Sequence, residues 1–267
     1  MRVMQPVAIK LFPLLAALAV FNTSTAKDES INADRPGIAD GSAVVGPGRF
    51  QIETGLQREW RNQSGEKTRT VFIPTLLRLG LSEAWEVRIE SNGYTWERVT
   101  AADGDFSKSS GAAPVSLGAK YRLLEGDGTS PSLGVIARVF PRSGGGSFRT
   151  RHTTGDVRLV ADWDFAEDWS LNPNIGLARY EDDAGEIFSA RLLAMTLSYS
   201  VNKKLSVFLD GALQTPELKN GGAQTVYDAG VAYLLTPDMQ LDFSAGVRGR
   251  GNTPPNQFIG AGISVRF

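Results

Sequence analysis

The sequence contains no cysteine among its 267 residues, so no disulfide can hold the chain together. A chain of this length without disulfides is held by an apolar core, by a lipid bilayer or by a closed hydrogen-bonded sheet. Long apolar runs are also missing, because after residue 26 no apolar stretch approaches the roughly 18 residues of a membrane-spanning helix. Transmembrane helices are therefore excluded for this part of the sequence.

Neither sign of charge is in excess. The 28 basic and 29 acidic residues are mixed along the chain, and the net charge is −1. A strongly basic patch, which nucleic acid or an anionic membrane surface would require, is therefore not indicated, and we predict no nucleic-acid partner. With one histidine and no cysteine, we also predict no metal site and no cofactor.

That single histidine, His152, is the only obvious candidate for a catalytic base. It lies in a polar stretch with Ser147 and Asp156 nearby in the sequence. Nucleophilic catalysis needs a base that is oriented by a third group and aimed at a nucleophile, and no serine motif accompanies His152. We therefore predict no catalytic residues and a protein that is not an enzyme.

The first 26 residues have the pattern of a secretory signal. Arg2 and Lys10 precede an apolar run over residues 11–20, and Ser24-Thr25-Ala26 offers the small residues that a signal peptidase reads. The apolar run is too short to span a bilayer. We predict a cleaved signal peptide over residues 1–26 and a mature chain that begins near Lys27.

From residue 49 onward the hydrophobic pattern has a period of two. Phe50, Ile52, Thr54 and Leu56 alternate with polar residues or glycine, which places the two kinds of side chain on opposite faces of a strand. Similar segments follow at regular spacing and bring the predicted number of strands to about twelve. They are expected near residues 49–60, 68–80, 85–94, 114–123, 132–140, 154–165, 169–180, 187–201, 205–214, 223–235, 240–249 and 256–267.

The connections between these segments are of two kinds. Tight turns alternate with longer polar loops, of which the longest are predicted over residues 95–111 and 141–151. Short turns at one end and long loops at the other are typical of bacterial outer-membrane barrels, in which the short side is periplasmic. The sequence therefore predicts an all-β protein, a transmembrane antiparallel up-and-down β-barrel over residues 49–267 with periplasmic termini. Residues 27–48 are predicted to form a periplasmic or lumenal segment.

A soluble β-sandwich or lipocalin-like barrel would show the same alternation with its apolar face inward. Two features favour the membrane barrel. Glycine weakens a water-facing strand but suits the inner wall of a curved barrel, and seven glycines lie on the predicted polar faces: Gly118, Gly134, Gly176, Gly230, Gly246, Gly260 and Gly262. Aromatic residues gather on the apolar faces beside the tight turns, as in an interfacial girdle: Trp85, Tyr121, Trp163, Trp169, Tyr199 and Tyr233.

The last residue, Phe267, continues this alternation to the chain end. A final strand that ends in an outward aromatic resembles the C-terminal signal of bacterial outer-membrane proteins, which the barrel-insertion machinery reads. The resemblance makes Phe267 the expected assembly signal, with that machinery and outer-membrane lipid as the expected partners. A final strand without a tail can also pair along its whole length with the first and leave no open sheet edge in lipid.

Three stretches resemble one known family. They are Asp34-Arg35-Pro36, the turn Gly46-Pro47-Gly48-Arg49-Phe50-Gln51 with the following Glu53, and "PTLLRLGLSEAWEVRI" over residues 74–89. They are similar to the phenol-degradation meta-pathway family (MetA-pathway of phenol degradation-like) of outer-membrane β-barrel transporters, and the likeness covers nearly the whole mature chain. The resemblance implies a location in the bacterial cell outer membrane and a role in transport.

Strand parity turns a set of charged side chains toward the barrel interior. Both signs occur, which argues against strong ion selectivity. Inward apolar residues, among them Leu76 and Phe140, offer contacts to a small aromatic or amphipathic solute. The predicted pore-lining residues are Glu53, Arg78, Glu86, Arg88, Glu90, Lys120, Arg122, Arg138, Arg158, Asp162, Asp210, Asp228, Asp242 and Arg248.

The function expected from this lumen is a channel for the passive passage of small solutes. One alternative is a plugged barrel with a structural, adhesive or binding role, because residues 27–48 have no strand of their own and can fold into the lumen. A lipid-modifying outer-membrane enzyme, built around His152, is the least favoured alternative.

Overall fold

The computed structural model describes residues 30–63, 65–127, 129–251 and 255–267. The expected signal peptide, residues 1–26, lies outside the described residues. No helix in the described part of the chain is long and apolar enough to cross a membrane. The elements are β1 (Phe50–Gln63), β2 (Glu66–Phe72), β3 (Thr75–Gly80), β4 (Trp85–Ser91), β5 (Tyr94–Thr100), β6 (Phe106–Ala112), β7 (Val115–Leu124), β8 (Ser132–Phe140), the 3-10 helix η1 (Gly146–Phe148), β9 (Thr154–Ala166), β10 (Trp169–Glu181), β11 (Ile187–Ser200), β12 (Leu205–Thr215), β13 (Gln224–Thr236), β14 (Met239–Arg250) and β15 (Gln257–Arg266).

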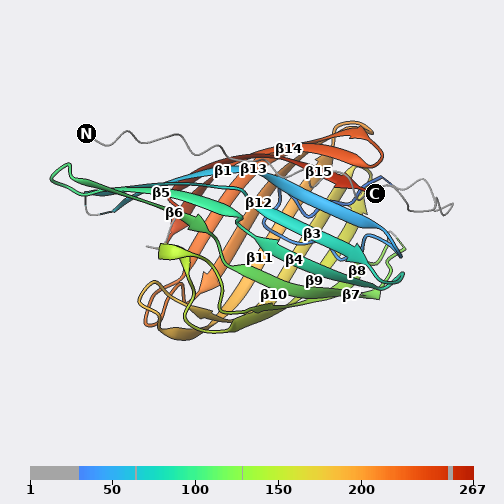
Figure 1. Ribbon diagram of the computed structural model, residues 1–267. Helices are drawn as coiled ribbons and strands as arrows, with labels where there is room; N and C mark the ends of the chain where they lie inside the picture. The colour runs from blue at the N-terminus through green and yellow to red at the C-terminus, as the bar shows by residue number, and fades with distance from the viewer. Residues whose placement is uncertain (1–29, 64, 128, 252–254) are drawn as a thin grey trace, which may run out of the picture.

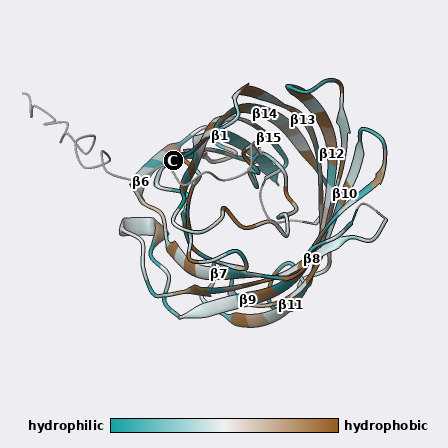
Figure 2. Cartoon of the chain, turned by 90° about the vertical axis from the view of Figure 1, so that its right-hand side faces the viewer, coloured by the Kyte–Doolittle hydropathy of each residue, from teal (hydrophilic) through white to brown (hydrophobic). Residues whose placement is uncertain are grey.

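The strands form one antiparallel sheet that closes on itself (Figures 1 and 2). Its closed ring runs β15-β14-β13-β12-β11-β10-β9-β8-β7-β4-β3-β1 and returns to β15, which makes twelve strands in the described chain. Where β1 and β15 close the ring, Phe50 N donates to Phe267 O at 3.2 Å, and Phe267 N donates to Phe50 O at 2.8 Å. The predicted antiparallel barrel of about twelve strands is confirmed.

Three breaks lie at the same level of the wall; two of them interrupt the predicted strands 68–80 and 85–94, and the third lies at the start of the predicted strand 114–123. The breaks fall at residues 73–74, 92–93 and 113–114, between β2 and β3, β4 and β5, and β6 and β7. Pro74 and Pro114 have no N–H to donate to a ladder, and Gly93 has a φ of +59°, outside the strand region. Backbone bonds link the breaks to one another: Ile73 N donates to Asn92 O at 3.1 Å, and Ala113 N donates to Gly93 O at 2.7 Å.

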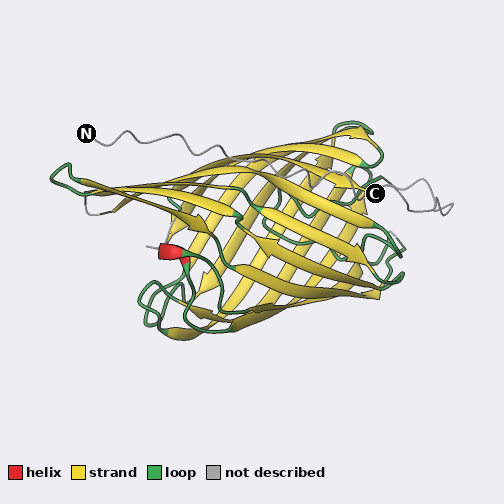
Figure 3. Cartoon of the chain, in the orientation of Figure 1, coloured by secondary structure: helices red, strands yellow, loops and turns green. Residues whose placement is uncertain are grey.

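The long loop expected over residues 95–111 is wrong. β5 and β6 form a hairpin there, with Thr100 opposite Phe106, and the hairpin projects beyond the barrel wall (Figure 1). This hairpin is rich in charge and serine on both faces, so it lacks the one-sided apolar alternation from which the other strands were predicted. The second expected loop, 141–151, is irregular apart from η1 (Figure 3).

The outer surface of the ring is apolar and exposed. Ile175, Leu177 and Leu209 are 61%, 68% and 61% exposed, although all three lie in the middle of strands. A water-soluble barrel would hide such side chains in its core, whereas a lipid bilayer solvates them. At the end with the short turns, called the turn end below, Trp85 lies 4.4 Å from Tyr121 between ring centroids, as expected for an interfacial girdle. The opposite end is called the loop end.

Residues 30–48, called the inner segment below, run inside the ring without regular secondary structure (Figure 2). The inner segment enters at the turn end, where Ile31 N donates to Pro237 O at 2.6 Å. It returns to the same end, where Gly48 N donates to Gly80 O at 2.9 Å, and continues into β1. The chain therefore forms a loop that rises into the lumen and comes back.

Candidate functional site

The lumen beside the inner segment is lined by charged side chains from β1, β3, β4 and β7. Because side chains alternate across a strand, the apolar outer face leaves the polar positions pointing inward. Glu53, Arg78, Glu86 and Lys120 are 0% exposed and Arg88 is 2% exposed. Buried charges are costly unless they are paired and hydrogen-bonded, so the partners of these groups decide what the site does.

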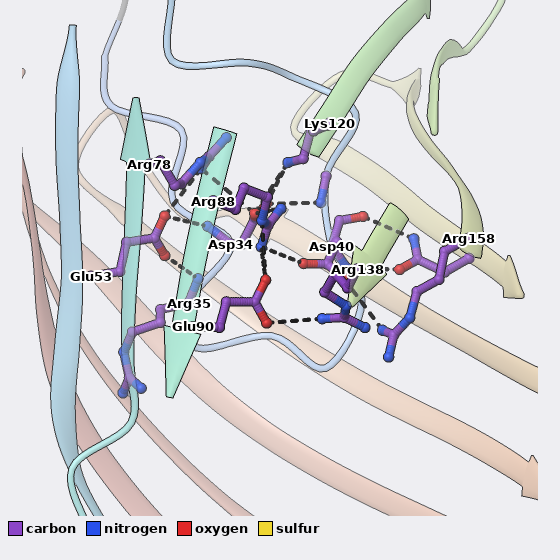
Figure 4. A network of polar contacts seen from close by, with 12 residues as sticks. Asp34, Arg35, Asp40, Glu53, Arg78, Arg88, Glu90, Lys120, Arg138 and Arg158 are labelled. Carbon is purple, nitrogen blue, oxygen red and sulfur yellow. Dashed lines mark hydrogen bonds and ion pairs between the residues drawn. The ribbon is translucent and has the colours of Figure 1, made fainter. Parts of the chain in front are cut away.

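Asp34 of the inner segment is at the centre of this site (Figure 4). Arg88 Nη1 donates to its Oδ2 at 2.8 Å, Lys120 Nζ donates to the same oxygen at 3.1 Å, and Arg78 Nη1 lies 3.6 Å away. Burial opposes ionisation of Asp34, but the charges of Arg78, Lys120 and Arg88 outweigh it and hold its pKa well below the usual range. Asp34 is therefore an anion that three wall cations share.

Arg78 joins the wall to the backbone of the inner segment. Its guanidinium forms a bidentate pair with Glu86, with both bonds at 2.9 Å, and donates to Glu53 at 3.0 Å. The same group also donates to two backbone carbonyls of the inner segment, Asn32 O and Ala43 O, each at 2.9 Å. One buried arginine thus binds both arms of the loop, because its planar fork presents five donors.

Asp40 is the second anion that the inner segment contributes. Arg88 Nη2 donates to its Oδ1 at 3.0 Å and Arg158 Nη1 donates to its Oδ2 at 3.3 Å. Its backbone N–H and C=O both pair with the amide of Asn174, each at 2.8 Å. Burial raises the pKa of Asp40, but Arg88 in particular lowers it by more, so this carboxyl also has a lowered pKa.

Arg35 points to a neighbouring part of the wall, where an acidic side chain of β14 binds it. Its guanidinium donates to Asp242 of β14 at 2.9 and 3.3 Å. The wall makes room for it with glycine: a Cβ added at Gly262 would lie 2.5 Å from Arg35 Nη2, and one added at Gly55 would lie 2.8 Å from the same atom. Gly55 and Gly262 therefore leave the space that the guanidinium of Arg35 occupies.

The predicted pore-lining residues are distributed as follows. Nine of them contact the inner segment: Glu53, Arg78, Glu86, Arg88, Lys120, Arg158, Asp242, Asp162 (through Ser42) and Asp210 (through Ile38 N). Glu90 and Arg138 bind each other at 2.9 Å beside them, and Asp228 lies opposite Asp210 across β12 and β13. Arg122 lies at the turn end, where it donates to Glu83 O at 2.6 Å, and Arg248 is half-buried toward the loop end.

Sequence reasoning missed the residues of the inner segment itself. Asp34, Arg35 and Asp40 were not predicted as site residues, because a stretch without periodicity gives no parity from which to place its side chains. Two signals were available in the sequence: three charges in a strandless stretch that precedes a barrel, and glycines on the lumenal faces. Both fit a chain that lies against the inner wall.

A cavity of about 430 Å³ lies on the loop-end side of the inner segment. Its floor consists of inner-segment and wall residues of the ion-pair network, including Asp34, Arg35 and Arg88. Its wall is less polar and follows the three strand breaks. The wall residues are Pro74, Thr75, Leu76, Ser91, Asn92, Ala113, Pro114, Ser116 and Phe140.

His152 lies outside the lumen, on the loop between β8 and β9. Its Nδ1 is 3.3 Å from Glu181 Oε2, and half of its side chain is exposed. Asp156 points into the lumen instead, where Arg138 binds both of its carboxylate oxygens at 2.7 and 2.9 Å. His152 and Asp156 therefore do not belong to one site.

The fold defines the class of the protein as a barrel of the outer-membrane type. It is similar in structure to the COG4313 outer membrane channel from Pseudomonas putida F1, with a TM-score of 0.63 and 14% identity over 85% of this chain and 98% of that chain. Two other similar structures are the NanC porin (TM-score 0.50, 12% identity, 81% and 98% covered) and the KdgM porin (TM-score 0.50, 9% identity, 82% and 99% covered). At these identities the likeness establishes the fold.

The chain belongs to the family described as "Putative MetA-pathway of phenol degradation", which it matches over residues 33–267. This match confirms the family expected from residues 34–36, 46–53 and 74–89. No curated protein is significantly similar to the chain in sequence.

Proposed function

We propose that the protein is a channel for the passive passage of small solutes across the bacterial outer membrane, and that its own inner segment closes the lumen at rest. The observation that carries this proposal is the way in which the inner segment is held. Side chains of the wall bind it, and no described residue of it forms a strand. Between its two backbone bonds at the turn end, Ile31 N to Pro237 O and Gly48 N to Gly80 O, the segment is held by contacts with wall side chains, and it can leave the wall without breaking the barrel.

The membrane part of the proposal rests on the exposed apolar outer face and the closed ring. Lipid cannot satisfy a free backbone group, so a spanning sheet has to close, and this one does. We place the turn end in the periplasm of a Gram-negative cell, with outer-membrane lipid around the wall. The barrel-insertion machinery would act on β15 and Phe267 during assembly.

The solute class follows from the cavity. The charges on its floor already pair with one another, as Asp34 does with Arg88 and Arg35 does with Asp242. Leu76, Phe140 and Pro114 on its wall offer apolar contacts. We therefore propose small uncharged solutes, aromatic or amphipathic ones included, as the cargo.

A plugged barrel with a structural, adhesive or binding role is the second candidate, and the same inner segment favours it. Single-channel recording in planar bilayers separates the two functions. The whole chain should give brief openings in KCl, and a variant without residues 30–45 should give longer openings of larger conductance. Silence from both proteins would contradict the channel, and identical conductance would show that the inner segment does not restrict the lumen.

A further inference from the structure

The barrel wall is not hydrogen-bonded all the way to its loop end. The ladder between β7 and β8 ends at Leu117 opposite Val139. Beyond that point β6 pairs with β5 on one edge, and its other edge has no ladder partner among the described residues. We call this free edge, over residues 106–116, the seam.

A glycine loop covers the seam in place of a strand. Residues 141–153, which include η1, lie against β6 (Figure 3). Two hydrogen bonds cross from this loop: Gly145 N donates to Ala112 O at 2.9 Å, and Val115 N donates to Ser143 Oγ at 3.0 Å. Gly144 and Gly146 on either side have φ of +88° and +58°, so the loop takes a backbone path that other residues adopt poorly. A cover held by so few bonds is easier to lift than a strand in a ladder.

The cavity reaches this seam from the inside. Ala113, Pro114 and Ser116 of the seam line it, and Phe140 at the end of β8 faces them. Ser116 is 3% exposed, and its hydroxyl has no hydrogen-bond partner among the described residues. A buried hydroxyl without a partner costs free energy, and a small solute with one polar group would satisfy it.

The seam also lies at the level of the membrane interface. Tyr94, the first residue of β5, lies nine positions beyond Trp85, the turn-end girdle residue at the start of β4. At a rise of about 3.3 Å per residue and a tilt of about 40°, that is about 23 Å, close to the height of the apolar band of an outer-membrane barrel. Tyr94 and Trp96, both 44% exposed, would then mark the outer interface, directly beyond the break at residues 92–93.

Two routes from the cavity can be compared, one along the axis toward the turn end and one through the seam. The way along the axis leads through the buried ion pairs of Asp34 and the inner segment, which have to come apart. The way through the seam disturbs only the glycine loop. We propose that small uncharged apolar solutes pass between the cavity and the outer part of the membrane sideways, through the seam between β6 and β8, while the inner segment stays in place. This inference rests on the proposed channel function and specifies its route.

Engineered disulfides can test the route, because the chain has no cysteine of its own. A Cβ added at Gly145 would lie 4.0 Å from Ala112 Cβ, within the range of disulfide geometry, so Ala112→Cys with Gly145→Cys locks the seam. A Cβ added at Gly134 would lie 3.3 Å from Ser42 Cβ, so Ser42→Cys with Gly134→Cys locks the inner segment to the wall. The second pair is the matched control for the axial route.

The measurement is uptake of radiolabelled toluene, with arabinose as the polar probe, by cells that produce each protein, before and after reduction with dithiothreitol. Heat-modifiable gel mobility establishes that every variant is folded. The seam lock should lower toluene uptake to the level of cells without the protein, and reduction should restore it. Oxidation of the inner-segment lock should leave toluene uptake unchanged.

The opposite pattern, in which the inner-segment lock stops toluene and the seam lock does not, would overturn the lateral route and leave the channel function standing. Toluene uptake that neither lock changes would also overturn it. If the unlocked protein raises uptake of neither toluene nor arabinose above that of cells without it, the proposed function itself fails.

Discussion

The two ends of the described chain both lie at the turn end, but they are held by different forces. β15 pairs with β14 on one edge and with β1 on the other, from Gln51 opposite Arg266 to Trp60 opposite Gln257. The inner segment makes no ladder and is held by side chains such as Arg78, Arg88 and Lys120. One end completes the wall, and the other fills the space that the wall encloses.

This difference decides which end of the described chain is fixed and which end can be released from the wall. A ladder in lipid has no alternative partner, so β15 cannot leave without exposing backbone groups that lipid does not satisfy. The charges around the inner segment differ, because water can replace each partner once the lumen is wet. The same chain therefore has a fixed C-terminal end and a releasable N-terminal end, which meet where Arg35 crosses Gly262.

The largest expected effect comes from neutralising the central anion. Asp34→Asn leaves three buried cations with less negative charge, and removal of one partner from a buried ion-pair network costs roughly 3–5 kcal/mol. We expect the ratio of closed to open lumen to fall by about a hundredfold or more, since about 1.4 kcal/mol corresponds to a factor of ten. Single-channel open probability measures this ratio. The control is Asp105→Asn in the exposed β5–β6 turn, and equal open probability in the two variants would contradict the prediction.

Asp242→Asn tests the contact of the inner segment with β14. It weakens the pair with Arg35 at 2.9 Å but leaves Asp34 and its three cations intact. A hydrogen bond to a charged group contributes about 1.5–3 kcal/mol, so the open probability should rise less than in Asp34→Asn. An effect of Asp242→Asn that exceeds the effect of Asp34→Asn would show that these two contacts of the inner segment have been ranked in the wrong order.

Gly262→Ala tests the point where the two ends of the chain meet. The new Cβ would lie 2.5 Å from Arg35 Nη2 and 2.6 Å from Thr54 O, and overpacking of this kind costs about 1–3 kcal/mol. The matched control is Gly260→Ala on the same strand, where the nearest atom would be Gln57 Oε1 at 3.7 Å. Open probability should rise in the Gly262 variant alone. A similar rise in both variants would mean that the strand, and not Arg35, has been disturbed.

Phe267→Asp should have the smallest thermodynamic effect. Phe267 is 52% exposed and stacks on Phe50, and a charge near the membrane interface costs only about 0–1 kcal/mol. Urea unfolding of the purified barrel should therefore shift little, as it should for Phe165→Asp, another exposed aromatic at the turn end. If Phe267 is also the assembly signal, heat-modifiable barrel in membranes should fall for Phe267→Asp only. Equal amounts from both variants would remove that role.

The regular part of the fold was predictable from the sequence because a two-sided wall imposes a period of two. β8 begins and ends at the predicted residues 132 and 140, and β9 to β15 agree with the predicted strands to within two residues. The hairpin of β5 and β6 was missed because it carries polar residues on both faces. The break at residues 73–74 interrupts the predicted strand 68–80, whose alternation continues on both sides, so the pattern alone does not show it.

The sequence by itself determined the barrel and its approximate strand number, because both follow from side-chain alternation along single strands, and the same alternation predicts which wall residues turn inward. Only the tertiary structure decided what the inward charges bind. Asp34 reaches Arg78, Arg88 and Lys120, which lie 44, 54 and 86 residues further along the chain, and Arg35 reaches Asp242. Contacts over such separations depend on the position of the inner segment inside the closed barrel, and no local sequence pattern encodes that position. The seam has the same origin, since an unpaired edge exists only relative to the strand that fails to reach it.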